Sequence, residues 1–178
     1  MSDVTPGTWQ LDPTHTEIGF TVRHIMSKVR GKFEKFEGTI VTAEDITASS
    51  ATATIELSSI NTGTADRDNH LRSGDFFNVE TTPTMKFVST EVVRKGDTDF
   101  VVRGDLTIKD VTKPIELDVE FLGEGKDPWG GTRIGVEATG QLSRKEWGID
   151  FNIPLEGDKV MIGDKITLQI NAEAVLQA

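Results

Sequence analysis

The stretch ITLQINAEA, residues 166–174, decides the fold of this chain. Every second residue in it is apolar, and this apolar set is Ile166, Leu168, Ile170, Ala172 and Ala174. Successive side chains of a β-strand point to opposite faces, so the alternation predicts a strand with one buried face and one exposed face. An amphipathic helix would instead repeat its apolar residues every three or four positions.

The same alternation recurs in six further segments of the chain. The residues on the repeating face are Ile18, Phe20 and Val22; Phe36, Gly38, Ile40 and Thr42; Ala53, Ile55 and Leu57; Phe100, Val102, Leu106 and Ile108; Ile115, Leu117, Val119 and Phe121; and Ile134, Val136, Ala138 and Leu142. Turn-forming residues separate these segments at 95–97, 127–131 and 156–158. The pattern predicts an all-β fold of about eight strands, either a closed up-and-down barrel or a sandwich.

No linker or shift in composition divides the sequence, so residues 1–178 are expected to form one domain. A barrel of eight strands is at the size where the interior either fills with side chains or holds one small ligand. Alternation along the strands is compatible with both interiors, because each gives an apolar inner face.

Composition narrows the class of protein. The formal net charge of -10 argues against nucleic-acid binding, which depends on cations that neutralise phosphates. The chain contains no cysteine, which excludes disulfides, thiolate metal sites and a cysteine nucleophile. The first residues lack the basic and apolar regions of a secretion signal, and no apolar run reaches the ~20 residues of a membrane helix. We expect a cytoplasmic protein.

The segment TADRDNHLRSGDFFNV, residues 64–79, departs from the alternation and predicts a short helix. Thr64 suits the N-cap, Asp66 lies in the first turn where a negative charge favours the helix dipole, and Gly74 suits the end. Asp66 and His70 are four residues apart, as are Asp68 and Arg72, so each pair is expected on one face of the helix.

This ionic helix has two interpretations. It is either a salt-bridged surface helix that joins two strands, or a cap across one end of the barrel. As a cap, it would direct Arg67, His70 or Arg72 at an anionic or hydroxylated head group, and Phe76 and Phe77 would help to close the barrel mouth.

The remaining polar candidates carry weaker signals. His15, His24 and His70 are the three histidines, but the odd spacing of the first two places them on opposite faces of a strand. We therefore expect no metal site. The basic run at 28–35 is typical of a solvated strand face, though it would also suit a phosphate or an acidic membrane. The sequence contains none of the common nucleophile, zinc-protease or phosphate-loop motifs.

Several segments together resemble the YceI family. They are WQLDPTHTEIGFTVRH at 9–24, MSKVRGKFEKFEGTI at 26–40, INTGTADRDNHLRSGDFFNVETTPTMKFVST at 60–90, VRGDLTIKDVTKPIELDV at 102–119, LSRKEWGI at 142–149 and IGDKITLQI at 162–170. The resemblance covers nearly the whole chain in order. Asp110 stands where many relatives carry glycine, which we expect to be a tolerated change in a turn.

The resemblance implies an extended, lipocalin-like antiparallel barrel whose apolar lumen binds a long polyisoprenoid, or a quinone-like amphiphile, without catalysis and without a cofactor. Some family members form dimers, so a homodimer and transient membrane contact are both compatible with it, and many members are exported to the periplasm. The positions that match the family signature are His15, His24, Arg67, Asp68, His70 and Leu71, and the aromatic matches are Phe76, Phe77 and Phe87. Phe20 and Val22 join this expected ligand-binding set because their alternating face would line the lumen.

Two alternatives from other classes remain open. The chain could be an enzyme that acts on a lipid head group through His70 and either Asp66 or Asp68. It could also be a barrel with a filled core and a structural or stress-related role.

Overall fold

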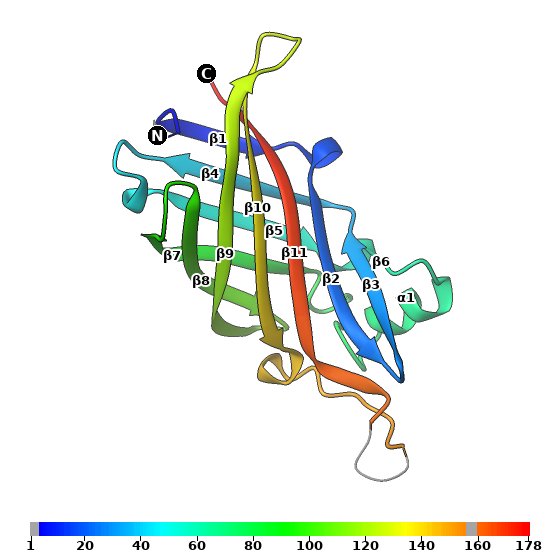
Figure 1. The fold of residues 1–178 in the computed structure, drawn as a ribbon. Helices are drawn as coiled ribbons and strands as arrows, with labels where there is room; N and C mark the ends of the chain where they lie inside the picture. The colour runs from blue at the N-terminus through cyan, green and yellow to red at the C-terminus, as the bar shows by residue number, and fades with distance from the viewer. Residues whose placement is uncertain (1–3, 156–159) are drawn as a thin grey trace.

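The computed structural model describes residues 4–155 and 160–178 as a closed antiparallel barrel with one short helix (Figure 1). The predicted turn at 156–158 lies outside these residues. The strands are β1 (Gly7–Leu11), β2 (Glu17–His24), β3 (Ser27–Phe33), β4 (Phe36–Thr42), β5 (Ser50–Glu56), β6 (Ile60–Asn61), β7 (Thr84–Arg94), β8 (Asp99–Ile108), β9 (Val111–Lys126), β10 (Thr132–Ser143) and β11 (Ile162–Leu176). Short 3-10 helices are η1 (Pro13–His15), η2 (Ile46–Ala48), η3 (Leu57–Ser59) and η4 (Arg144–Trp147).

Eight of these strands close the barrel, in the order β1, β4, β5, β7, β8, β9, β10 and β11, and β11 pairs back with β1. Figure 1 shows β9, β10 and β11 crossing in front of β4, β5, β7 and β8. The expected lipocalin-like barrel of about eight strands is therefore confirmed. β1 and β2 pair in succession with one edge of β11, so η1 interrupts what is otherwise a single strand position.

The register of the sheet explains the alternation in the sequence. Opposite the decisive stretch of β11, β10 places Ile134 against Ala174 and Ala138 against Ile170. Apolar residues of neighbouring strands therefore face each other across the ladder, and their shared side forms the inner wall of the barrel. The face of each strand that was predicted to be buried is the one that points inward.

Close contacts between strands need glycine at defined places. Gly31 of β3 is paired with Phe20 of β2, and a Cβ atom at Gly31 would lie 2.4 Å from the Phe20 ring.

The turn between β8 and β9 has Lys109 and Asp110 at positive φ values of 53° and 64°. Aspartate tolerates this left-handed backbone, so Asp110 suits the turn without glycine.

Helix α1 (Ala65–Arg72) carries the ionic segment and begins at the predicted N-cap, Thr64. It ends with Ser73 as the C-cap, one residue before the predicted Gly74. At eight residues, this helix is far too short to cross a membrane, and no helix within the described part of the chain is both long and apolar enough to do so.

Candidate ligand-binding cavity

The barrel encloses an apolar cavity of about 360 Å³. Side chains from all eight closing strands contribute to its wall, together with β2, β3 and the segment after α1. Nearly all of the lining residues are aliphatic or aromatic, and the polar residues among them are Thr39, Thr42, Ser49, Ser50, Thr52 and Arg144. A wall of this chemistry suits an apolar guest, because it offers few hydrogen-bonding groups to replace those of water.

The cavity follows from the strand register. Ile18, Phe20 and Val22 of β2 line it, whereas the intervening Thr21 does not. Val22 is paired with Val29 of β3 and with Ile166 of β11, so the inner face stays apolar across three strands.

Aromatic rings close the barrel on the side of α1. The Phe33 ring lies 5.6 Å from the Phe20 ring and 6.1 Å from the Phe77 ring, measured between centroids. Phe76 is buried and packs in an edge-to-face arrangement against Phe151. Phe76 and Phe77 therefore hold the segment after α1 against the barrel.

Two charged side chains of α1, those of Arg67 and Asp68, form hydrogen bonds with the chain just before the helix. Asp68 is buried, and its Oδ1 accepts hydrogen bonds from the Thr62 backbone N–H at 2.9 Å and from the Thr62 hydroxyl at 2.5 Å. Arg67 donates to the Thr62 Oγ1 and to the Thr62 carbonyl, each at 2.7 Å. These bonds fix the chain that enters the helix, so the geometry favours a brace over a head-group contact.

Arg72 and His70 of the helix also have partners. Arg72 donates to the carbonyls of Ser58 at 2.8 Å and Ile60 at 3.2 Å, which ties the helix to the chain around β6. His70 Nε2 lies 2.8 Å from Asp75 Oδ2. Each of the pairs Asp66–His70 and Asp68–Arg72 shares a face of the helix, as predicted, but neither forms an ion pair within the described residues. Arg72 also donates to Asn69 Oδ1, one turn earlier, at 2.9 Å.

The expected ligand-binding residues divide into two groups. The first group lines the cavity and consists of Phe20, Val22, Leu71, Phe76, Phe77 and Phe87. The second group lies away from the cavity wall and consists of His15, His24, Arg67, Asp68 and His70. A direct role of the second group in ligand binding stays a prediction.

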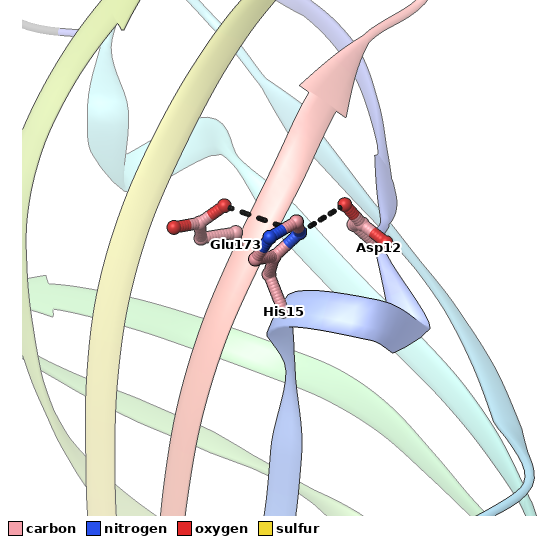
Figure 2. A group of neighbouring side chains, drawn as sticks. All are labelled: Asp12, His15 and Glu173. Atoms are coloured by element: carbon pink, nitrogen blue, oxygen red, sulfur yellow. Dashed lines mark hydrogen bonds and ion pairs between the residues drawn. The ribbon is translucent and has the colours of Figure 1, made fainter. Parts of the chain in front are cut away.

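The three histidines are far apart in the fold. His15 ends η1 beside the outer face of β11, and His24 is the last residue of β2, where it is paired with Ile162. Figure 2 shows His15 between Asp12 and Glu173. Its Nδ1 lies 2.8 Å from Asp12 Oδ2 and 3.9 Å from Glu173 Oε2. One ligand atom from each of these three residues would lie within 4.8 Å of the others, which is close enough to hold a metal ion.

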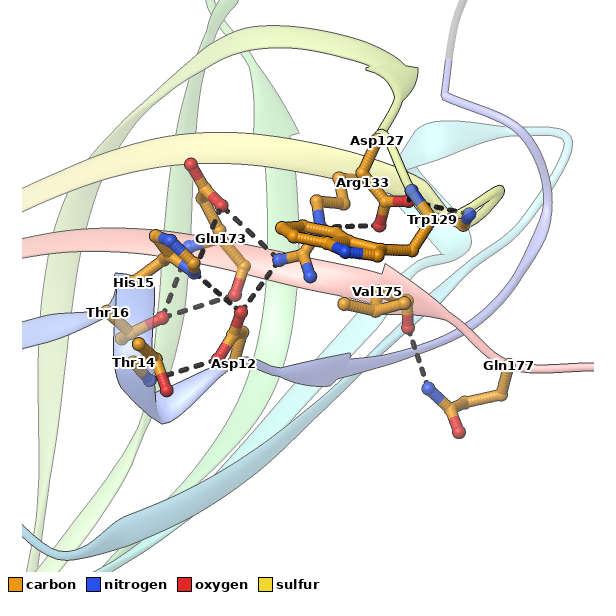
Figure 3. Close-up of polar contacts among 11 residues, drawn as sticks. Asp12, Thr14, His15, Thr16, Asp127, Trp129, Arg133, Glu173, Val175 and Gln177 are labelled. Atoms are coloured by element: carbon orange, nitrogen blue, oxygen red, sulfur yellow. Dashed lines mark hydrogen bonds and ion pairs between the residues drawn. The ribbon is translucent and has the colours of Figure 1, made fainter.

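Arg133 already supplies a positive charge to this group (Figure 3). Its Nη1 donates to Asp12 Oδ2 at 2.7 Å, and its Nε donates to Asp127 Oδ2 at 2.8 Å. Hydrogen bonds from His15 and then from Arg133 hold the pKa of Asp12 well below its usual range. The same cation lowers the pKa of Asp127. The cluster is therefore a surface ionic network that joins η1, β11 and the β9–β10 turn. A metal ion bound here would have to compete with the Arg133 guanidinium.

Arg144 is a buried residue that the pattern of the sequence did not indicate. Its guanidinium donates to the carbonyls of Gly163, Ile149 and Phe151, each at 2.9 Å, and to that of Ile162 at 3.4 Å. Burial lowers the pKa of this guanidinium. Two of these bonds fasten η4 to the start of β11, and the other two fasten it to the segment that follows η4. Only the resemblance of residues 142–149 marked this segment, since arginine is ordinarily an exposed residue.

Comparisons with known proteins place these features in a family. The profile of the YceI-like domain matches residues 9–174. A UPF0312 protein of Photorhabdus laumondii is 46% identical over 140 residues, which is 78% of this chain and 70% of the relative.

Solved structures share the barrel. The YceI protein of Campylobacter jejuni is 30% identical, covers 100% of both chains and superposes with a TM-score of 0.74. A polyisoprenoid binding domain from Saccharophagus degradans has the same fold, with a TM-score of 0.70 at 18% identity over 95% of this chain and 98% of that domain.

Proposed function

The chain belongs to the YceI-like family, and from this membership we propose that its barrel binds a long-chain polyisoprenoid or an isoprenoid quinone-like amphiphile, for transport or storage. The observation that carries the proposal is the continuous apolar cavity of about 360 Å³ inside the barrel. A filled core would leave no such space, so the cavity argues against the structural alternative.

The chemistry of the wall supports an uncharged guest. Within the described part of the chain, Arg144 is the one charged residue that borders the cavity, and its guanidinium is bonded to four backbone carbonyls. An ionised head group buried here would therefore have no spare partner, at a high cost in free energy. A prenyl chain has no such group, and dispersion contacts along it suit aliphatic and aromatic walls.

The hydroxyl groups of Thr39 and Thr42, two of the polar lining residues, already have partners within the protein. Thr39 lies on the outward face of β4, where it donates to Gln10 Oε1. Thr42 Oγ1 accepts from the Trp9 indole N–H and donates to the Thr5 carbonyl. We therefore propose no fixed position for the polar end of the ligand.

The size of the proposed tail predicts tight binding. Larger ligands typically gain ~0.3 kcal/mol per heavy atom. A tail of about forty carbons would then contribute about -12 kcal/mol, which corresponds to a nanomolar dissociation constant. The Saccharophagus domain, described as polyisoprenoid binding, shares this fold and supports the choice of an isoprenoid.

We propose no catalytic role for His70. Its carboxylate partner is Asp75, both side chains are about half exposed, and neither residue lines the cavity. Among the described residues, neither of the acids that the enzyme alternative required, Asp66 and Asp68, forms an ion pair with His70. Asp68 instead accepts hydrogen bonds from Thr62.

The identity of the co-purified ligand tests the proposal. Protein purified without detergent is analysed by native mass spectrometry, and the bound material is then extracted with organic solvent and identified. We expect a long-chain isoprenoid near one per chain, and a higher melting temperature when a prenol or a quinone is added to emptied protein. Protein that is always empty and gains no stability from such lipids would overturn the proposal.

Substitutions on β2 provide the matched control. Val22→Glu places a charge on the cavity wall and should abolish uptake, whereas Thr21→Glu points away from the cavity and should leave uptake unchanged. Circular dichroism identifies any variant that fails to fold.

A further inference from the structure

We propose that the turn between β2 and β3, together with residues 153–155 and 160–161, forms a tip that docks on an anionic lipid bilayer. We call this surface the docking tip, and its apolar residues are Ile25, Met26, Ile153, Leu155 and Val160. The docking geometry stands on its own observations, although its purpose, the exchange of a lipophilic ligand, rests on the proposed function.

The docking tip concentrates exposed apolar side chains. Met26 is 88% exposed and Ile25 is 48% exposed. Of the nine large hydrophobic residues that are exposed in the described part of the chain, five belong to this surface. Single exposed apolar residues are common on proteins, but a cluster of them marks a site of interaction.

Backbone hydrogen bonds join the two halves of the docking tip. The N–H of Ile25 donates to the Met161 carbonyl at 2.7 Å, and the N–H of Met161 donates to the Ile153 carbonyl at 3.0 Å. A bridge between Pro154 and Val160 holds the second half together. The apolar side chains are therefore presented by one connected piece of backbone.

The β2–β3 turn is unusual for a hairpin. Ile25 has a φ of 57°, a left-handed conformation that disfavours a β-branched residue. The β8–β9 hairpin of the same barrel uses the polar pair Lys109 and Asp110 at the equivalent two positions. Turns favour glycine, asparagine or aspartate there. Isoleucine and methionine do not favour such a turn. Their presence at these two positions therefore points to a role for their exposed side chains.

Cations surround the apolar residues on the outer face of the same hairpin. Arg23 is paired with Lys28, and Arg30 and Lys32 follow at alternate positions of β3, opposite the outward residues Thr21 and Gly19. All four cations are exposed, and none of them forms an ion pair within residues 4–155 and 160–178. The chain as a whole carries a net charge of -10, so this hairpin is a local reversal of sign.

An anionic bilayer is the partner that fits both features. Basic side chains next to exposed apolar ones bind where acidic head groups border the acyl chains. Figure 1 shows the ends of β2 and β3 and the start of β11 projecting together beyond the body of the barrel. A projecting tip can enter a fluid interface without a complementary pocket, whereas a protein partner would need one. The nearby Asp164 does not cancel the charge, because Lys145 and Arg144 lie 3.4 Å and 3.7 Å from it.

Vesicle co-sedimentation tests the docking tip with the full chain. Vesicles of phosphatidylcholine alone are compared with vesicles that also contain phosphatidylglycerol. We expect binding to the anionic vesicles that weakens as salt is raised, and little binding to the neutral ones. The double substitution Ile25→Ser with Met26→Ser should weaken binding about tenfold or more. Lys28→Gln should weaken it about fivefold.

Matched controls separate the docking tip from general surface properties. Leu122→Ser removes an apolar side chain of similar exposure, 55%, from the C-terminal part of β9, and Lys113→Gln removes a cation near the start of that strand. Both should bind vesicles like the original chain. Equal losses in tip and control variants, or no preference for anionic vesicles, would overturn the proposal.

Two further outcomes distinguish this proposal from the proposed function. If size-exclusion chromatography shows a dimer that the tip substitutions dissociate, a second copy of the chain covers the tip and the bilayer proposal fails. If vesicle docking fails while an isoprenoid still co-purifies, only the docking proposal falls. If the protein docks on vesicles but its cavity never holds lipid, the docking tip is supported and the proposed ligand is contradicted.

Discussion

Filling the cavity should stabilise the barrel and weaken ligand binding at the same time. Ala53 of β5 lines the cavity between Gly38 of β4 and Phe87 of β7, and its side chain is only partly buried. Ala53→Leu adds three carbons to a wall that faces open space. At about 0.8 kcal/mol per buried methylene, the substitution should raise the free energy of unfolding of empty protein by up to about 2.4 kcal/mol.

For a domain of this size, each kcal/mol shifts the melting temperature by about 2–4 °C, so we expect an increase of about 5–10 °C in ligand-free protein. The same three carbons displace a similar number of ligand carbons. At ~0.3 kcal/mol per heavy atom, the affinity should fall about fivefold. Thermal unfolding of delipidated protein and competition against a fluorescently labelled prenyl chain measure the two effects separately.

The neighbouring Thr54 supplies the control, because it does not line the cavity. Thr54→Leu should leave the affinity unchanged. Overpacking of a filled core costs about 1–3 kcal/mol. A lower melting temperature for Ala53→Leu with full ligand uptake would therefore show that this side chain does not face open space, and the reasoning would be refuted.

Three further substitutions test individual polar contacts. Thr42→Val removes the acceptor of the buried Trp9 indole N–H, 2.9 Å away, and should lower the free energy of unfolding by about 1–3 kcal/mol in a urea titration; unchanged stability would count against this bond. Asp12 has a lowered pKa, so its stabilising contribution is present above the unfolded value near 3.9 and is lost as pH falls through the folded value. Asp12→Asn should therefore reduce stability at pH 7 and flatten its decline below about pH 4; an unaltered acid limb would contradict this. Arg67→Ala should reduce stability without changing ligand affinity, and a tenfold loss of affinity at constant melting temperature would instead indicate a head-group contact.

The inner wall of the barrel could be predicted from the sequence because it depends on a local rule. Alternation fixes which face of a strand is buried, and Phe20 and Val22 accordingly line the cavity. The rule also gave the approximate number of strands in the barrel. It did not show that β1 and β2 share one edge of β11, because that arrangement depends on strands at opposite ends of the chain.

The partners of charged residues could not be predicted in the same way. Helical spacing placed Asp68 and Arg72 on one face, yet Asp68 is only 7% exposed and accepts its hydrogen bonds from Thr62. A buried carboxylate needs donors of fixed geometry, and the backbone before the helix supplies them better than a flexible side chain one turn away. The partners of Arg144 could not be predicted from local spacing either, because its four carbonyl acceptors lie in later segments of the chain.

The pairing of β1 with β11 has a consequence for biosynthesis. Trp9 of β1 faces Leu176 of β11, so the contact that seals the barrel joins the first and the last strand of the structure. A ribosome makes β1 long before it makes β11. Until β11 has been made, the edges of β1 and β10 that it will cover have no partner, and pairing over so long a separation is slow. The growing chain is thus an open sheet before it becomes a closed barrel. In the interval before β11 pairs, its apolar face is most exposed to misassociation and most accessible to a hydrophobic ligand.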